Sequence, residues 1–215
     1  MTLQEQLKQF QNTTIERMPQ HIMKVFTDGI EALRKEKLQE KALHVGNLFP
    51  DMTLYDTNKN SVLISTFQNS EFLILNFYRG GWCPYCNMEL REYERLRKDF
   101  NAIGVDIIGI SAESSDLANT TTHKNALSYP ILTDVNAQLM KAIGIVFELD
   151  EATKKEYLNF GIDLTKNHGN DRFELPVPAV YVINQKMEIQ FVHLEEDYAT
   201  RLEPTVLLNF LTSKK

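Results

Sequence analysis

The chain has 215 residues, of which 43% are hydrophobic and 24% charged, and its formal net charge is −6 at pH 7. This length and composition suit a globular protein with a sizeable core, and the acidic balance argues against nucleic acid or an anionic membrane as partner. No apolar run approaches the roughly 20 residues that a membrane span needs. The polar first ten residues do not resemble a secretory signal, so we expect a cytoplasmic protein.

Residues 1–42 carry apolar side chains at steps of three and four, which predicts amphipathic helices. Pro19 disfavours a helical conformation at Met18 and therefore predicts a break between two helices. We interpret this segment as a helical arm that packs on the main domain, residues 43–215, or on a second subunit. The second alternative would make the protein a homodimer.

The main domain begins with two short predicted strands, 52–55 and 62–64, around a turn-rich loop. The nearly continuous apolar run 72–78 is typical of a central strand buried on both faces. A helix follows, and the run 105–111 predicts the next buried strand. Strand, helix and strand in this order indicate a parallel crossover, and such crossovers are right-handed.

The second half of the domain continues this alternation up to a charged excursion at 147–175, for which no element is predicted. The predicted fold class is α/β, with a mixed central β-sheet, helices on both faces and an N-terminal helical extension. The remaining expected elements are helices at 114–127, 135–143 and 202–211, a strand at 131–133, and an antiparallel strand pair at 180–183 and 188–192.

The only two cysteines, Cys83 and Cys86, lie at the turn between the central strand and the following helix. If Cys83 caps this helix and Pro84 is its first residue, the free amides and the positive end of the helix dipole favour a Cys83 thiolate. Cys86 lies one turn further along the same face and closer to the core, so we expect it to be less exposed and less acidic. The pair predicts reversible dithiol chemistry, with Cys83 as the reactive thiol and Cys86 as the resolving thiol.

The residues before Cys83 are candidates for positioning a substrate. Gly80 and Gly81 lack side chains where a small substrate or a partner's backbone would approach. Trp82 either shields the pair from water or simply fills the core. Arg79 either places its guanidinium group beside Cys83 or points into solvent.

Two other interpretations of the cysteines are a structural thiol pair and half of a zinc site. Zinc needs four ligands, and the chain has no second Cys-x-x-Cys and no histidine pair at ligand spacing. It also has no phosphate-cradling glycine loop. We therefore expect neither a metal nor a cofactor.

Four segments, in this order, carry a resemblance to a known family. They read GNLFPDMTLYD at 46–56, FYRGGWCPYC at 77–86, IIGISAE at 107–113 and YPILTD at 129–134. Over residues 45–212 the chain resembles the peroxiredoxin-like branch (the alkyl hydroperoxide reductase/thiol-specific antioxidant, AhpC/TSA, type) of the thioredoxin superfamily. The resemblance implies a thioredoxin-like fold, a hydroperoxide or disulfide substrate, and a thioredoxin-like electron donor.

The same resemblance assigns roles to residues beside the pair. Thioredoxin-like proteins place a cis proline before a strand, facing the cysteines, and Pro178 would be that residue. Val177 would then offer its backbone to a substrate disulfide segment; the alternative is a trans proline at a strand start. The inner dipeptide Pro84-Tyr85 is the one found in glutaredoxins, which implies a pair less reducing than thioredoxin.

The chain also departs from the pattern of the families it resembles. Peroxiredoxins carry a threonine or serine three residues before the reactive cysteine and a proline seven before, where this chain has Gly80 and Asn76. The arginine that peroxiredoxins place on a later strand has no identified counterpart. Asp197, Tyr198 and Arg201 also resemble a segment of this branch, but no catalytic role is assigned to them and we expect a salt-bridged turn. Thioredoxins place a carboxylate where Phe77 stands, so Cys86 needs another proton acceptor, either water or Glu89.

Three functions remain open from the sequence. The first is a thiol peroxidase, in which Cys83 reduces a hydroperoxide and Cys86 closes a disulfide that a thioredoxin-type donor reduces. The alternative is a thiol–disulfide oxidoreductase that acts on protein disulfides without peroxidase activity. The third is a redox sensor that uses the pair slowly and signals through the arm.

Overall fold

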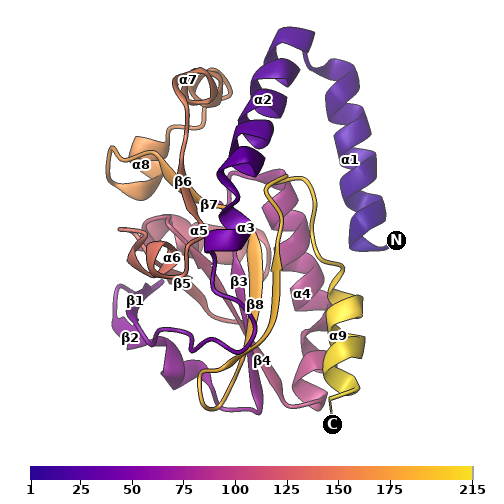
Figure 1. The fold of residues 1–215 in the computed structure, drawn as a ribbon, viewed down its shortest axis with the longest axis vertical. Helices are drawn as coiled ribbons and strands as arrows, with labels where there is room; N and C mark the ends of the chain where they lie inside the picture. The colour runs from indigo at the N-terminus through magenta and orange to yellow at the C-terminus, as the bar shows by residue number, and fades with distance from the viewer. Residues whose placement is uncertain (215) are drawn as a thin grey trace.

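The computed structural model describes residues 1–214, which form a mixed β-sheet between two layers of helices (Figure 1). Within these residues the main sheet has seven strands in the order β2-β1-β5-β4-β3-β8-β9. The predicted α/β class and central mixed sheet are confirmed. The strands are β1 (Thr53–Asp56), β2 (Ser61–Leu63), β3 (Phe72–Phe77), β4 (Val105–Ser111), β5 (Ile131–Thr133), β8 (Ala179–Asn184) and β9 (Ile189–Leu194).

The central strand β3 pairs with β4 in parallel and with β8 antiparallel. The parallel partner follows the long helix α4 (Pro84–Ala102), so the predicted crossover is confirmed as parallel. The predicted terminal pair β8–β9 is antiparallel, as is the hairpin β1–β2. The reactive turn thus follows the carboxyl end of an interior strand of the sheet.

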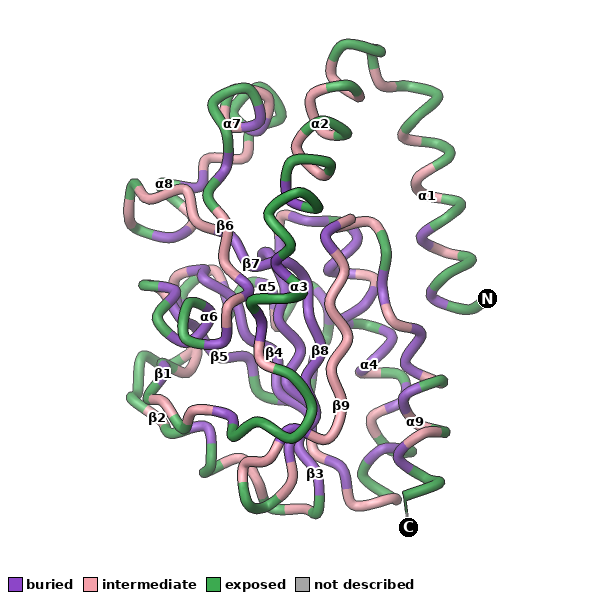
Figure 2. Tube along the Cα trace, viewed as in Figure 1, coloured by how far each residue is buried: buried purple, intermediate pink, exposed green. Residues whose placement is uncertain are grey.

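The N-terminal arm consists of α1 (Leu3–Arg17), α2 (Gln20–Glu36) and the short α3 (Leu38–Lys41). The predicted break is confirmed, because Met18 is extended and Pro19 caps α2. In Figure 1, α1 and α2 rise above one end of the sheet as a hairpin. In Figure 2 the residues of α1 and α2 are mostly exposed or intermediate, whereas those of β3, β4 and β8 are mostly buried.

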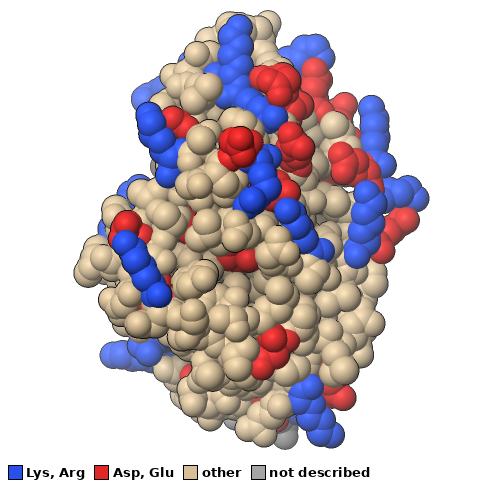
Figure 3. Space-filling view, turned by 90° about the vertical axis from the view of Figure 1, so that its left-hand side faces the viewer, with Lys and Arg blue, Asp and Glu red and all other residues tan. Residues whose placement is uncertain are grey.

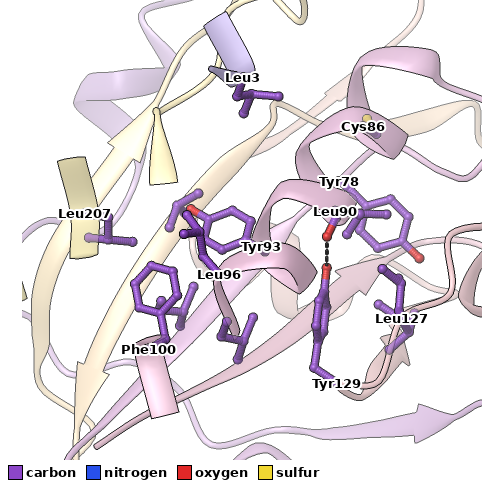
Figure 4. Close-up of a cluster of buried hydrophobic side chains, with 14 of the residues drawn as sticks. Leu3, Tyr78, Cys86, Leu90, Tyr93, Leu96, Phe100, Leu127, Tyr129 and Leu207 are labelled. Atoms are coloured by element: carbon purple, nitrogen blue, oxygen red, sulfur yellow. Dashed lines mark hydrogen bonds between the residues drawn. The ribbon is translucent and has the colours of Figure 1, made fainter. Parts of the chain in front are cut away.

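Two apolar clusters lie on opposite faces of the sheet, because successive strand side chains point to opposite sides. Ile74 of β3 faces the cluster under α1, α4 and the C-terminal helix α9 (Pro204–Thr212). Leu75 of β3 faces the other cluster, with Ala42, which follows the short helix α3, and residues of α6 (Gln138–Ala142). Figure 4 shows the first cluster, with Cys86 at its edge and the Tyr129 hydroxyl donating to the Leu90 carbonyl of α4 at 2.9 Å.

Two helices on the sheet's flanks are shorter than the sequence predicted. Helix α5 spans Ser115–Lys124. Helix α6 begins only at Gln138, because Ala137 adopts a left-handed conformation and the Asp134 carboxylate accepts from the amides of Gln138 and Met140. Residues 135–137 therefore form a turn in place of the predicted first helical turn.

The charged excursion has structure that the sequence did not predict. It contains the two-stranded sheet β6 (Val146–Glu148) and β7 (Glu174–Pro176), with helices α7 (Glu151–Asn159) and α8 (Leu164–His168) between them. Tyr157 of α7 packs against Phe26 of α2, with ring centroids 6.0 Å apart. The excursion thus joins the arm to the sheet.

The surface carries charges of both signs. On the face drawn in Figure 3, Lys and Arg alternate with Asp and Glu, and no large patch of one sign forms. No helix within residues 1–214 combines the length and apolar character that crossing a membrane requires.

Candidate active site

The two cysteines lie at the start of α4, as the sequence predicted. Cys83 caps the helix in an extended conformation and Pro84 is its first residue. Both thiols are free and buried, with 2% of Cys83 and 0% of Cys86 exposed to solvent. The helix therefore presents its unpaired amides to a thiol that water hardly reaches.

Burial alone would raise the pKa of Cys83, but three neighbours outweigh it. A hydrogen bond with the Cys86 side chain and the positive charges of Arg79 and Arg201 hold the pKa of Cys83 at about 6. Burial raises the pKa of Cys86 well above its usual value, and the neighbouring Cys83 raises it further. The predicted division into an acidic thiol and a less acidic one is supported by this geometry.

Arg79 is buried beside Cys83 and does not point into solvent, since only 3% of it is exposed. Its guanidinium carbon lies 4.3 Å from the centroid of Tyr198, 5.0 Å from that of Trp82 and 5.6 Å from that of Tyr157. Its Nε has no hydrogen-bond partner among the described residues. The rings hold the cation through cation–π attraction, and the anion that faces it is the Cys83 thiolate.

Arg201 is the second buried cation, and it is paired with a carboxylate. Its Nε lies 2.7 Å from Oε2 of Glu89, and both side chains are 2% exposed. The guanidinium group also donates to Sγ of Cys86 at 3.4 Å and to the carbonyls of Tyr198 and Thr200. Arg201 has no catalytic role that its sequence context predicts, and the structure places it directly on the cysteine pair.

Glu89 follows Cys86 by one helical turn and faces the same buried space. Burial raises its pKa to about 7, against the opposing pull of Arg201. This carboxyl group therefore takes up a proton more readily near neutral pH than an exposed glutamate does. Such a group beside a thiol is suited to exchanging a proton with it.

The glycine pair is explained by packing within the protein. A β-carbon at Gly80 would collide with the indole of Trp82, and Gly80 has a φ of +148°. A β-carbon at Gly81 would collide with the side chain of Thr121, and the Gly81 amide donates to Oε1 of Glu113 at 2.9 Å. The space expected for a substrate is thus filled by the chain's own side chains, and a substrate role for these glycines stays a prediction.

The other residues of the motif lie around the pair in different environments. Trp82 packs edge-on against Tyr157, with centroids 5.4 Å apart, and borders the cluster that contains both cysteines. Tyr85 packs between Phe10 of the arm and Tyr198, at 5.2 and 5.7 Å. Pro84 is exposed. Their contributions to substrate positioning stay predictions.

The cis conformation predicted at Pro178 is wrong, because no peptide bond within residues 1–214 is cis. The Val177 amide donates to the Ile145 carbonyl at 2.8 Å, which extends the β6–β7 pairing to this point. Val177 is fully buried in a cluster with Leu33 and Leu38 of the arm. The chain therefore runs extended from β7 into β8, and the Val177 amide is not available to a substrate segment.

No group of three or more His, Cys, Asp or Glu side chains within residues 1–214 is arranged to hold a metal ion. The site is built from sulfur, two guanidinium groups, a carboxyl group and aromatic rings. Together with the fold, these define the class of the protein as a thioredoxin-like dithiol protein.

The chain belongs to the AhpC/TSA family, whose model matches residues 45–192. Among curated relatives, "Peroxiredoxin 2" of Thermoplasma acidophilum is 27% identical over 115 residues, which cover 51% of this chain and 57% of that protein. "Thiol-disulfide oxidoreductase ResA" of Bacillus thuringiensis is 25% identical over 109 residues, which cover 50% of this chain and 62% of that protein. The matches thus span less than two thirds of these relatives.

Solved structures share the fold at low sequence identity. The peroxidoxin BcpB of Mycobacterium tuberculosis has a TM-score of 0.63 at 17% identity, over 80% of this chain and 99% of that chain. Reduced Prx3 of Vibrio vulnificus in complex with H2O2 has a TM-score of 0.63 at 16% identity, over 79% and 99%. The arm and the Arg201 loop lie outside the family match, although Arg201 contacts Cys86.

Sequence reasoning missed three side chains that shape this site: Arg201, Tyr157 and Tyr198. Arg201 and Tyr198 come from the loop before α9, and Tyr157 comes from the excursion. Each is more than 70 residues from the cysteines, so no local spacing connects them to the pair. A weak signal was present in the Asp197–Arg201 segment, which resembled the family but had no assigned role.

We predict that the reduced protein ionises one thiol at a pH of about 6 and the other only well above the usual range of thiols. Arg79→Met should raise the lower value, because it removes the unpaired cation. Arg91→Met, on the exposed surface of α4, is the matched control and should leave the lower pKa unchanged. The measurement is the ultraviolet absorbance of the thiolate against pH, and equal titrations of all three proteins would contradict the assignment.

The same shift sets the pH dependence of stability. The pKa of Cys83 lies below the value of 9.0 expected in the unfolded chain. Its thiolate therefore stabilises the reduced fold, and this stabilisation is fully present above pH 9.0. This stabilisation decreases as the pH falls through about 6. Cys83→Ser should lack this slope in urea unfolding experiments performed across the same range.

The Glu89–Arg201 pair predicts an asymmetry between its two deletions. In a Cys83→Ser background, Glu89→Gln leaves a buried guanidinium that cannot lose its charge and should cost about 3–5 kcal/mol of unfolding free energy. Arg201→Met should cost less, because Glu89 can bind a proton and become neutral. Urea unfolding at neutral pH tests this, and equal losses would show that the pair's charges do not set its stability.

Proposed function

We propose that this protein is a thiol peroxidase that reduces hydroperoxides through Cys83. The observation that carries the proposal is the buried Cys83 thiolate, held at a pKa of about 6 beside two guanidinium groups, with Cys86 next to it. A thiolate is the nucleophile for peroxide oxygen, and a resolving thiol within reach traps the product. Membership of the AhpC/TSA family supports the same chemistry.

The first step breaks the O–O bond. The Cys83 thiolate attacks the terminal oxygen of the hydroperoxide, an S–O bond forms, and Cys83 becomes a sulfenic acid while an alkoxide or hydroxide leaves. The leaving oxygen takes a proton and departs as an alcohol or water. Arg79 and Arg201 lie where they stabilise the negative charge that moves from sulfur to oxygen, in place of the hydroxyl that Gly80 lacks.

The second step forms the disulfide. Cys86 loses its proton and attacks the Cys83 sulfenic sulfur, and water leaves, so that the peroxide has been reduced by two electrons from the two thiols. Glu89 is the proposed proton acceptor, because it shares the buried face of Cys86 and has a pKa of about 7. Arg201, 3.4 Å from the Cys86 sulfur, stabilises the resulting thiolate.

A dithiol donor must return two electrons to the disulfide in every cycle. We infer a donor of the thioredoxin type, which would attack a sulfur of the pair through its own thiolate. Pro84 is exposed between the cysteines and gives the donor a surface to approach. The cytoplasmic location and the homodimer stay predictions from the sequence.

We predict that the reduced protein consumes hydrogen peroxide with a thioredoxin system as donor, and that Cys83→Ser abolishes this turnover. Cys86→Ser should complete one oxidation and stop as the Cys83 sulfenic acid, because no thiol resolves it. Peroxide consumption and trapping of the sulfenic acid by dimedone are the measurements. Turnover by Cys83→Ser at the wild-type rate would overturn the proposal.

A second candidate function is a thiol–disulfide oxidoreductase. The similarity to ResA and the absence of a hydroxyl side chain at Gly80 favour it. The engaged amide of Val177 disfavours it, because a protein substrate would lack the backbone partner expected there. This function requires a Cys83 mixed disulfide with a protein, which Cys86 would then release.

The two functions separate in a trapping experiment. Under the peroxidase proposal, Cys86→Ser without peroxide should form few mixed disulfides with proteins, whereas added peroxide should convert Cys83 to the dimedone-reactive acid. Cys86→Ala is a second variant with the same expectation. Abundant protein adducts in the absence of peroxide would favour the oxidoreductase over the peroxidase.

A further inference from the structure

The reactive turn, residues 80–83, contains a glycine whose conformation is set by side chains from outside the turn. The Cys83 amide donates to the Gly80 carbonyl at 3.1 Å, which closes the turn over Gly81. Gly81 cannot carry a side chain, because a β-carbon there would collide with Thr121. Since glycine has more backbone freedom than any other residue, this position would by itself be the loosest point of the turn.

Three side chains hold the two peptide groups that meet at Gly81. The Gly81 amide donates to Oε1 of Glu113 at 2.9 Å. The Gly81 carbonyl accepts from Nδ2 of Asn87 at 2.8 Å and from Nζ of Lys124 at 3.2 Å. Because each peptide group is planar, fixing the amide and the carbonyl fixes both backbone dihedral angles of the glycine.

Glu113 is buried and is itself held on a second side. It follows β4 and is 2% exposed. Its Oε2 accepts from the hydroxyl of Thr121 on α5 at 3.2 Å, and its own amide donates to Oγ of Ser111 at 3.3 Å. A buried polar group is costly unless hydrogen bonds satisfy it, and here an amide of the reactive turn is one of the donors. The carboxyl group and the turn therefore depend on each other.

We infer that Glu113 is a positioning residue for the reaction of Cys83, an inference that rests on the proposed peroxidase function. Glu113 fixes Gly81, and thereby fixes the directions in which the chain places Trp82 and the Cys83 sulfur. It does this without touching the reacting atoms, through one backbone amide two residues before the thiolate.

The two residues after Gly81 carry the parts of the site that depend on its conformation. The Trp82 ring centroid lies 5.0 Å from the guanidinium carbon of Arg79. Burial raises the pKa of Cys83, and a hydrogen bond with Cys86 and the charge of Arg79 lower it. Coulomb attraction falls with distance, so a turn that rotates freely at Gly81 would lose part of this stabilisation of the thiolate.

The charge of Glu113 and its hydrogen bonds act on the thiols in opposite directions. Burial raises the pKa of Glu113 to about 7, against the hydrogen bonds from Gly81 and Thr121 and the charge of Lys124, and the charge of Cys86 raises it further. A negative charge in this space disfavours a thiolate. The hydrogen bonds favour the Cys83 thiolate, because they keep it beside the cations. The two effects separate when the charge is removed and the hydrogen bonds are kept.

Titration of the reduced, full-length protein makes this separation. Glu113→Leu removes the acceptor of the Gly81 amide and should raise the pKa of Cys83 by about one pH unit, because the sulfur leaves part of its cationic environment. Glu113→Gln keeps an oxygen for that amide and should leave the pKa unchanged or lower it. The measurement is the ultraviolet absorbance of the thiolate against pH.

Asp134 provides the matched control for stability. It follows β5, which is parallel to β4, and its buried carboxyl group accepts from the amides of Gln138 and Met140. Asp134→Leu and Glu113→Leu should both lower the midpoint of urea unfolding. Only Glu113→Leu should shift the titration of Cys83.

A milder pair of variants decides the question if Glu113→Leu does not fold. Thr121→Val removes one hydrogen bond to Glu113 and keeps its charge, so it should raise the pKa of Cys83 by a smaller amount. Thr122→Val, beside it on α5, removes a hydroxyl that donates to the Ala118 carbonyl at 2.9 Å. This control should leave the titration unchanged.

Trp82, the only tryptophan of the chain, gives a second readout. Its indole nitrogen is buried, and a loosened turn would expose it. Glu113→Leu should therefore increase acrylamide quenching of its fluorescence about two-fold. Glu113→Gln and Asp134→Leu should leave the quenching unchanged.

Turnover connects the turn to the reaction. The kcat/KM for hydrogen peroxide should fall about ten-fold in Glu113→Leu and recover in Glu113→Gln, because a displaced nucleophile attacks less effectively. The titration and the fluorescence need no peroxidase activity. They therefore test the role of Glu113 even if Cys83 reduces no hydroperoxide.

Three outcomes would overturn the inference. The first is that Glu113→Leu, or Thr121→Val if the former does not fold, leaves the titration of Cys83 at the wild-type value. The second is that Glu113→Leu and Glu113→Gln shift this titration alike, which would assign the effect to the charge. The third is that Asp134→Leu shifts it as far as Glu113→Leu does, which would assign the effect to lost stability.

Discussion

The site depends on the burial of one negative charge. A thiolate that water hardly reaches is unstable unless positive charge accompanies it into the interior. Here two guanidinium groups are buried with Cys83, and within residues 1–214 only Arg201 has a carboxylate partner. Arg79 has aromatic rings around it, so the Cys83 thiolate is its counter-ion. When Cys83 is oxidised, this counter-ion disappears, and the reduced state is therefore the electrostatically preferred one.

Assembling these charges requires segments that are distant in the sequence. Arg79 and Cys83 follow the central strand β3, and Glu89 is on α4. Arg201 reaches the pair from the loop before α9, and the excursion contributes Tyr157. The sheet order places β3 inside the sheet between β4 and β8, and elements from both sides of the sheet converge on the turn that follows it. The chain's later half thus completes a site whose reactive atoms lie in its first half.

The predictable part of the molecule is the part with local signals. The apolar run of β3, the cap at Cys83 and the proline at position 84 determine a buried strand and a helix start through interactions between neighbours in the sequence. Two of the groups that lower the pKa of Cys83, Cys86 and Arg79, are also near it in the sequence. The sequence predicted these elements and the order of the thiol acidities for that reason. The secondary structure of the excursion was not predicted, because its short strands β6 and β7 are stabilised by each other and by the arm, and not by local sequence signals.

The same distinction explains the errors at the site. The role of Arg201 is set by a contact across 115 residues, for which one sequence contains no spacing rule. The cis conformation expected at Pro178 came from the family, whereas in this chain the pairing of the Val177 amide with Ile145 keeps the backbone extended. Family resemblance transfers a local conformation only when the surrounding pairing is also shared.

The missing hydroxyl at position 80 follows from the neighbouring tryptophan. A side chain at Gly80 would collide with the indole of Trp82, and the φ of +148° there is one that a threonine rarely adopts. Trp82 in turn is held by Tyr157 and lies over Arg79. Glycine at position 80 is therefore coupled to the aromatic enclosure of the guanidinium group. The chain has no neutral hydrogen-bond donor on a side chain at position 80. The buried Arg79 cation stabilises the Cys83 thiolate and, in the proposed reaction, would stabilise the charge that develops on a peroxide oxygen by the same electrostatic attraction.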